Sequence, residues 1–168
     1  MLVSAVAALA LVAAACSSSK SSTPAGGGAV TIEAHAGPLG TYLTNGQGVS
    51  LYLFASDTSG KSTCTGACLT TWPAVTGTPT AGSGVTASLL GTITDSNGAK
   101  QVTYNGHPLY TYTGDSSAGE TNGQGTDNFG AKWWLVAPNG NDIMGAGGGG
   151  SSSSSSSSSS GGGGGGWS

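Results

Sequence analysis

Arginine is absent from this chain of 168 residues, and charge of either sign is scarce. Only four lysines and seven acidic residues are present, which gives a formal net charge of −3. A nucleic-acid-binding protein needs several basic side chains to neutralise phosphates and release counterions. The composition therefore excludes nucleic acid as a partner. It also disfavours a nucleotide site, because no bidentate arginine clamp is available for phosphates.

The usual catalytic and cofactor motifs are also missing. The chain has no Gly-x-Ser-x-Gly, no His-Glu-x-x-His and no Cys-x-x-Cys-His sequence. Its two histidines, His35 and His107, do not lie at ligand spacing from a cysteine pair. We therefore expect a protein that is not an enzyme, with no catalytic residues, no metal site and no cofactor.

Long apolar runs are absent apart from the N-terminal residues 1–15, which are almost entirely Leu, Val and Ala. This run is too short for a transmembrane helix and is typical of a secretory signal peptide. Small residues precede Cys16, as in lipoproteins whose cysteine is lipidated and becomes the mature N-terminus. Ordinary signal cleavage beside an incidental cysteine is the alternative. Residues 16–29, rich in Ser, Gly, Thr and Pro, then form a flexible tether.

Cysteine is rare as well, with three residues in all. If Cys16 carries lipid, Cys64 and Cys68 remain as a pair in an oxidising compartment, and we predict a disulfide between them. The loop between them is short, so the bond should stabilise the fold by only about 1–2 kcal/mol and mainly fix local geometry. A redox-active pair is the alternative, although such pairs usually have two intervening residues at a helix N-terminus.

Helical periodicity is lacking, and the abundant Thr, Val, Tyr, Gly and Ser favour strands and turns. We expect an all-β, antiparallel sandwich or small barrel over residues 30–144, built from two repeated hairpin units. Residues 145–168 form a Gly/Ser low-complexity tail, and both ends of the chain should be disordered. A short helix near Ala67 to Thr71, stopped by Pro73, is the one exception. The hairpin turns are expected at residues 45–48, 95–98 and 105–108.

Two copies of the pattern Tyr-x-aromatic-x-x-Asp stand 58 residues apart in the chain. A short pattern that recurs in this way indicates one supersecondary unit used twice. The members of the two copies are Tyr52, Phe54 and Asp57 in the first, and Tyr110, Tyr112 and Asp115 in the second.

Strand geometry gives this pattern a structural interpretation. Residues two apart in a strand point to the same face, so the aromatic pair of each copy should pack together. Asp57 and Asp115 come where each strand should end, and they should accept backbone N–H groups of the turn just ahead. A tyrosine hydroxyl could also bond the aspartate or a nearby carbonyl. The functional alternative is an acidic pair that holds Ca²⁺ or acts as acid and base in a hydrolase.

The residues around both copies resemble a family of bacterial secreted proteins and lipoproteins, a repeat of unknown function named for its Yx(F/W/Y)xxD motif. In the first copy the resemblance continues to the Cys64–Cys68 loop and Trp72. In the second it continues to Trp133 and Trp134. The similar segments are residues 41–75 and 102–137. The resemblance implies a location in the cell envelope, often as a lipoprotein, and implies no particular activity.

These observations give two hypotheses of function. The first is a lipid-anchored module on the extracytoplasmic face of the cell membrane. It would have a non-enzymatic binding or structural role, with the membrane and an envelope protein or carbohydrate as partners. The second is an envelope redox or metal-binding protein that uses Cys64, Cys68 and the motif aspartates.

Overall fold

The computed structural model describes residues 27–145. The predicted signal peptide, the lipidated Cys16, most of the predicted tether and nearly all of the Gly/Ser tail lie outside the described residues. The helices of the described part are too short to cross a bilayer.

Short strands are the main regular structure of the described chain, as the all-β prediction required. The strands are β1 (Ala29–Gly37), β2 (Gly40–Asn45), β3 (Tyr52–Phe54), β4 (Thr78–Ala81), β5 (Leu90–Thr94), β6 (Lys100–Tyr104), β7 (His107–Pro108), β8 (Asp127–Asn128) and β9 (Ala131–Leu135). One α-helix, α1 (Ala67–Thr71), lies where the sequence predicts it and ends before Pro73, and one 3-10 turn covers Ala87–Leu89.

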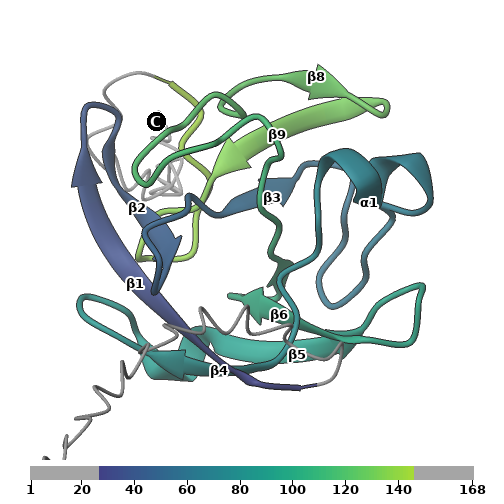
Figure 1. The fold of residues 1–168 in the computed structure, drawn as a ribbon, viewed down its shortest axis with the longest axis horizontal. Coiled ribbons are helices and arrows are strands. Elements are labelled where there is room, and N and C mark those ends of the chain that lie inside the picture. The colour runs from purple at the N-terminus through teal and green to yellow at the C-terminus, as the bar shows by residue number, and fades with distance from the viewer. Residues whose placement is uncertain (1–26, 146–168) are drawn as a thin grey trace, which may run out of the picture.

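The strands form three sheets of three strands each, in the orders β2-β1-β4, β3-β9-β8 and β5-β6-β7. Figure 1 shows β8 and β9 along one side of the molecule, β4, β5 and β6 along the opposite side, and β1 and β2 between them. No sheet of residues 27–145 closes into a barrel. Pairing is antiparallel with one exception, because β1 and β4 run parallel. A parallel pair needs a long connection, and most of the first repeat supplies it here.

The turn signals locate one hairpin correctly and two in part. β5 and β6 pair as predicted around residues 95–98, where Asp95 Oδ1 accepts the N–H groups of Asn97 and Ala99. β6 and β7 pair around a tighter turn, Asn105-Gly106. The hairpin expected around residues 45–48 is reduced to a single bridge, Thr44 to Ser50, since the main partner of β2 is β1 and that of β3 is β9.

The strand expected after the third turn, at residues 109–113, is not formed. Tyr110 instead makes isolated bridges to Tyr52 and Ala74, which both belong to the first half of the chain. The next residues are held in the same way, because the N–H groups of Thr111 and Thr113 donate to the carbonyls of Pro73 and Thr71. The second motif copy is therefore inserted against the first half rather than paired within its own hairpin.

Two buried clusters fill the interior. The aromatic core contains Tyr42, Tyr52, Phe54, Cys64, Cys68, Trp72, Tyr110, Trp133, Leu135 and Ile143. The aliphatic core contains Ile32, Leu43, Leu51, Leu53, Val75, Val102, Tyr104, Leu109 and Val136. Neighbouring residues of one segment, such as Leu51 and Tyr52, belong to different cores because successive side chains of an extended chain point to opposite faces. The motif segments thus lie between the two cores and are covered on both sides.

Candidate functional site

The two motif copies meet at their tyrosines. The N–H of Tyr52 donates to the carbonyl of Tyr110 at 2.9 Å, and the N–H of Tyr110 donates to the carbonyl of Tyr52 at 3.0 Å. A pair of residues that exchange both backbone bonds is the hydrogen-bonded pair of an antiparallel ladder. The two copies are therefore related by an approximate twofold axis that passes between these residues.

Each tyrosine hydroxyl crosses to the aspartate of the other copy. Tyr52 donates to Asp115 Oδ2 at 2.7 Å, and Tyr110 donates to Asp57 Oδ2 at 2.6 Å. The sequence suggested a tyrosine–aspartate bond, but nothing in it indicated that the bond would exchange partners between the copies. Because each bond joins one half of the chain to the other, the pattern binds the two repeats together.

The second oxygen of each aspartate fixes the loop that follows it. Asp57 Oδ1 accepts the N–H and the hydroxyl of Thr63 at 2.7 and 2.8 Å, and Asp115 Oδ1 accepts the N–H of Asn122 at 2.8 Å. The predicted role in chain geometry fits these bonds, although the donors lie six and seven residues ahead rather than in the next turn. The aspartates thus close longer loops than the sequence suggested.

The other aromatic residues form a stack of four rings that alternates between the repeats. Phe54 stacks on Trp133 with centroids 4.3 Å apart, Trp133 on Trp72 at 3.9 Å, and Trp72 on Tyr112 at 4.3 Å. The two indole planes are parallel within 1°. Each motif tyrosine meets the tryptophan of its own repeat edge-on, at 5.4 Å for Tyr52 and 5.1 Å for Tyr110. The edge-on contacts are the geometry that the ring quadrupole favours.

Close approach of the chain to this stack requires glycine at position 123. A Cβ atom built there would lie 2.7 Å from Cη2 of Trp72 and 2.9 Å from Cζ of Tyr52, which is too close for any other residue. The N–H of Gly123 also donates to the hydroxyl of Tyr52 at 3.3 Å. The glycine at position 123 of the second repeat is therefore a packing requirement of the tyrosine–tryptophan contact.

Burial changes the acidity of this network. Desolvation raises the pKa of both Tyr52 and Tyr110 far above the ordinary value of 10.0, and donation to an aspartate raises it further. Burial also raises the pKa of Asp115. The hydrogen bonds from Tyr52 and Asn122 favour the carboxylate and lower this pKa, but the effect of burial is larger. The hydroxyls therefore stay protonated and act as donors under ordinary conditions.

The predicted disulfide between Cys64 and Cys68 is present, with the two Cα atoms 5.3 Å apart. Both cysteines belong to the aromatic core, with exposed fractions of 1% and 4%. The hydroxyl of Ser62, two residues before Cys64, lies 2.7 Å from the hydroxyl of Tyr110, oxygen to oxygen. The bond thus holds the loop of the first repeat against the tyrosine–aspartate network, with little sulfur surface open to solvent.

Asp57 lines a small cavity whose lining does not include Asp115. This cavity of about 200 Å³ also includes His107 and Asp142. Within the part of the chain that the structure describes, no three His, Cys, Asp or Glu residues lie close enough together to hold a metal ion. Each carboxylate of the acid–base pair considered for a hydrolase instead accepts hydrogen bonds from a tyrosine of the other copy and from its own loop.

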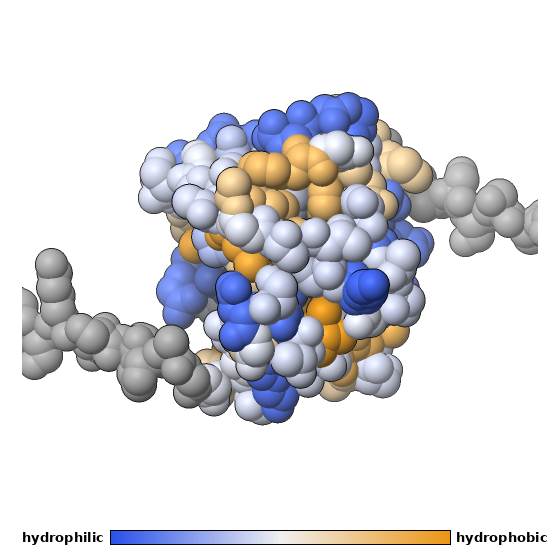
Figure 2. All heavy atoms as spheres, turned by 90° about the vertical axis from the view of Figure 1, so that its right-hand side faces the viewer, coloured by the Kyte–Doolittle hydropathy of each residue, from blue (hydrophilic) through white to orange (hydrophobic). Residues whose placement is uncertain are grey.

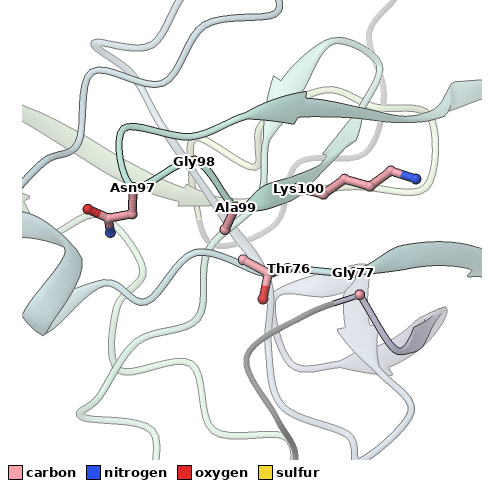
Figure 3. Close-up of a pocket in the computed structure, with 7 residues that line it drawn as sticks. Thr76, Gly77, Asn97, Gly98, Ala99 and Lys100 are labelled. Carbon is pink, nitrogen blue, oxygen red and sulfur yellow. The ribbon is translucent and has the colours of Figure 1, made fainter.

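A larger cavity of about 540 Å³ lies away from the motif residues. It lies between Thr76-Gly77 and the β5–β6 turn, and Figure 3 shows Asn97 and Lys100 at its two ends with small residues between. Lys100 is the one ionisable residue in its lining. Its other polar side chains are those of Thr76 and Asn97.

Comparison with known proteins agrees with the internal symmetry. The model of a family described as a secreted repeat of unknown function matches the chain twice, at residues 34–76 and 91–137. The protein belongs to this family. The two matches contain the two motif copies, and together they span more than half of the chain. As a secreted repeat the protein functions outside the cytoplasm. No curated protein and no solved structure matches it.

Proposed function

We propose that this secreted repeat protein is a lipid-anchored, non-enzymatic module of the bacterial cell envelope, with a binding or structural role. The observation that carries the proposal is the exchange of bonds between the repeats. Both motif tyrosines, both motif aspartates and the stacked rings are engaged in holding one half of the chain to the other. Residues committed to packing in this way are poor candidates for chemistry.

The lipid anchor is tested at Cys16. The full chain is expressed in a bacterium that processes lipoproteins, and the membrane fraction and the medium are assayed for the Cys16→Ser variant and the parent. We expect the parent in the membrane, with a mass that starts at an acylated Cys16, and the variant in the medium. The double variant Cys64→Ser/Cys68→Ser is the matched control, because it removes the other cysteines and should remain anchored. A membrane-bound Cys16→Ser protein contradicts the anchor.

The non-enzymatic role is tested at the aspartates. Asp57→Asn and Asp115→Asn keep the size of each side chain but weaken its acceptor atoms, so both should lower the melting temperature. Elemental analysis of the purified parent should find no metal at stoichiometric level. A variant that melts like the parent yet loses a bound metal would show that the carboxylates serve a site rather than the fold.

The redox alternative requires an attacking thiolate to reach a sulfur of the Cys64–Cys68 bond. The burial of both cysteines argues against it. Intact-mass measurement during mild reduction of the native protein separates the two functions. A bond that resists until the protein unfolds supports a structural role, and a bond that opens in the folded state supports redox chemistry.

A further inference from the structure

Two hairpin turns of this fold share one backbone geometry and can be compared directly. Asn105-Gly106 joins β6 to β7, and Phe129-Gly130 joins β8 to β9. All four residues have positive φ, at 50° and 80° in the first turn and 60° and 91° in the second. Two-residue turns of this kind favour Asn-Gly, because asparagine and glycine tolerate positive φ. The first turn follows the rule and the second does not.

Phenylalanine at positive φ is strained, since its Cβ lies too close to the backbone. Packing does not offset this strain, because Phe129 remains 48% exposed and belongs to neither buried core. The surrounding hairpin is nevertheless held firmly. The indole N–H of Trp133 donates to the carbonyl of Asn128 at 3.2 Å, and the backbone of Trp133 exchanges bonds with Thr126 and Gly125. A strained residue kept in a well-determined frame points to a function.

The surface around the ring indicates the ligand. The flanking Asp127 and Lys132 form an ion pair at 3.5 Å, so their charges cancel, and residues 121–141 carry no other charge. Figure 2, drawn from the side toward which the hairpin tip points in Figure 1, shows hydrophobic residues directly beside hydrophilic ones on this face. A protein with four lysines and a net charge of −3 does not attract anionic membranes or polyanions.

We infer that the tip of the β8–β9 hairpin is a binding site for a neutral polysaccharide, with Phe129 as its stacking platform. The C–H face of a sugar ring packs on an aromatic face, whose electron density attracts the polarised hydrogens. Asp127 and Asn128 offer hydroxyl acceptors beside the ring, and Lys132 offers a donor. This inference rests on the proposed function, because it names the ligand of the envelope module.

The test is calorimetric titration of the full chain with tetramers of glucose and of N-acetylglucosamine. A polyoxyethylene detergent is used, because a glycoside detergent would compete. We expect at least one tetramer to bind the parent, and Phe129→Asn to weaken that binding at least about tenfold, a change well above measurement error. Phe129→Trp keeps a ring and should bind as well as the parent. The inference is wrong if neither tetramer binds the parent, or if Phe129→Asn binds within about twofold of it.

Stability and self-association separate the remaining explanations. Phe129→Asn copies the favourable turn at Asn105, so its melting temperature should rise by about 4 °C. Loss of binding in a more stable protein cannot result from unfolding. Sedimentation velocity of the parent and of Phe129→Asn tests whether the ring joins two copies of the chain, and binding to phosphatidylcholine vesicles tests a lipid partner. If self-association or vesicle binding depends on Phe129, the inference is wrong. The anchoring assay at Cys16 tests the proposed function separately, because its result does not depend on Phe129.

Discussion

The two repeats use the same motif bonds but close the following loop by different means. In the first repeat the loop carries the Cys64–Cys68 disulfide and α1 before it reaches Trp72. In the second repeat it has no cysteine, and the carboxylate of Glu120 accepts the N–H groups of Ser116 and Ser117 at 2.6 and 3.2 Å. The tyrosine–aspartate exchange is thus common to both repeats, whereas the contacts that close the following loop differ.

The equivalent tryptophans differ in one further respect. The indole N–H of Trp133 donates to Asn128, whereas the Nε1 atom of Trp72 is buried with no acceptor among the described residues. A buried donor without a partner costs roughly 1–3 kcal/mol. The unpaired N–H of Trp72 therefore costs the first repeat free energy that the second repeat does not lose at Trp133, although the ring stack is symmetric.

Removal of a central ring should give the largest effect. Trp72→Ala and Trp133→Ala each delete a fully buried indole that two rings of the other repeat contact, and each should lower the free energy of unfolding by about 3–5 kcal/mol. Because the stack joins both repeats, urea unfolding monitored by circular dichroism and fluorescence should stay a single transition. Two separated transitions in either variant would show that the repeats fold independently.

A gentler change sharpens the comparison between the tryptophans. Trp133→Phe loses the hydrogen bond to Asn128, whereas Trp72→Phe removes a donor that has no partner. We expect Trp133→Phe to be the more destabilising by about 1 kcal/mol. An equal fall in the free energy of unfolding for both variants would mean that the N–H of Trp72 has an acceptor in solution, such as a bound water.

The exchanged tyrosine–aspartate bonds should be visible in double-mutant cycles. The cross-repeat pair Tyr52→Phe with Asp115→Asn should show a coupling energy of about 1–2 kcal/mol, because the first change removes the donor and the second weakens the acceptor of the same bond. The pair Tyr110→Phe with Asp57→Asn should behave in the same way. Both are measured by chemical unfolding of the single and double variants.

The matched control is the pair within one copy. Tyr52→Phe with Asp57→Asn changes two residues that share no hydrogen bond. The two decreases in the free energy of unfolding should therefore be closer to additive. Stronger coupling within a copy than between copies would contradict the exchange.

The sequence predicts the elements of this fold better than their partners. Turn residues at 95–98 and the proline after α1 determine local geometry, so the β5–β6 hairpin and the helix follow from short segments. The disulfide was predictable because Cys64 and Cys68 are the pair that remains when Cys16 is assigned to the lipid. The failed strand at residues 109–113 has a physical cause: Tyr110 finds its partner in Tyr52, and local alternation carries no information about such distant pairing.

The candidate sites were predictable to different degrees. The motif marks Tyr52, Asp57, Tyr110 and Asp115 as special, and their exchange between repeats depends on the twofold packing, which spacing does not encode. Phe129 gives almost no signal, because phenylalanine is not a turn residue and Phe-Gly does not indicate a hairpin. The Gly130 that follows it between two extended segments is the one hint in the sequence.

Alkaline pH should weaken both repeats together. The pKa values of Tyr52 and Tyr110 are raised on folding. The contribution of the two protonated hydroxyls to the free energy of unfolding is therefore complete below about pH 10, and it is lost as the pH rises toward the folded-state pKa values. Above pH 10 the free energy of unfolding should fall by about 1.4 kcal/mol per pH unit for each tyrosine. Urea unfolding over this range measures the slope, and Tyr52→Phe/Tyr110→Phe should reduce it.

Removal of the disulfide should cost less free energy of unfolding, and its effect should be confined to the first repeat. The loop it closes is short, so Cys64→Ser/Cys68→Ser should lower the free energy of unfolding by about 2 kcal/mol or less. Hydrogen exchange should increase at residues 62–72, with little change at residues 116–124. Equal loosening of both loops would show that the disulfide supports the whole interface between the repeats.

Mild acid should produce the smallest change in stability, and this change should be confined to the second repeat. The N–H groups of Ser116 and Ser117 lower the pKa of Glu120, so its contribution is present above the ordinary value of 4.5 and is lost as the pH falls through the folded-state value. Asp115 acts in the opposite direction, because its raised pKa favours the folded state as the pH falls. Glu120→Gln isolates the first effect. The protection of the Ser116 and Ser117 N–H groups from exchange, relative to the intrinsic rate at each pH, should fall in acid for the parent and should be low at every pH for the variant. Unchanged protection in the variant would mean that backbone geometry, and not the carboxylate, closes the loop that replaces the disulfide.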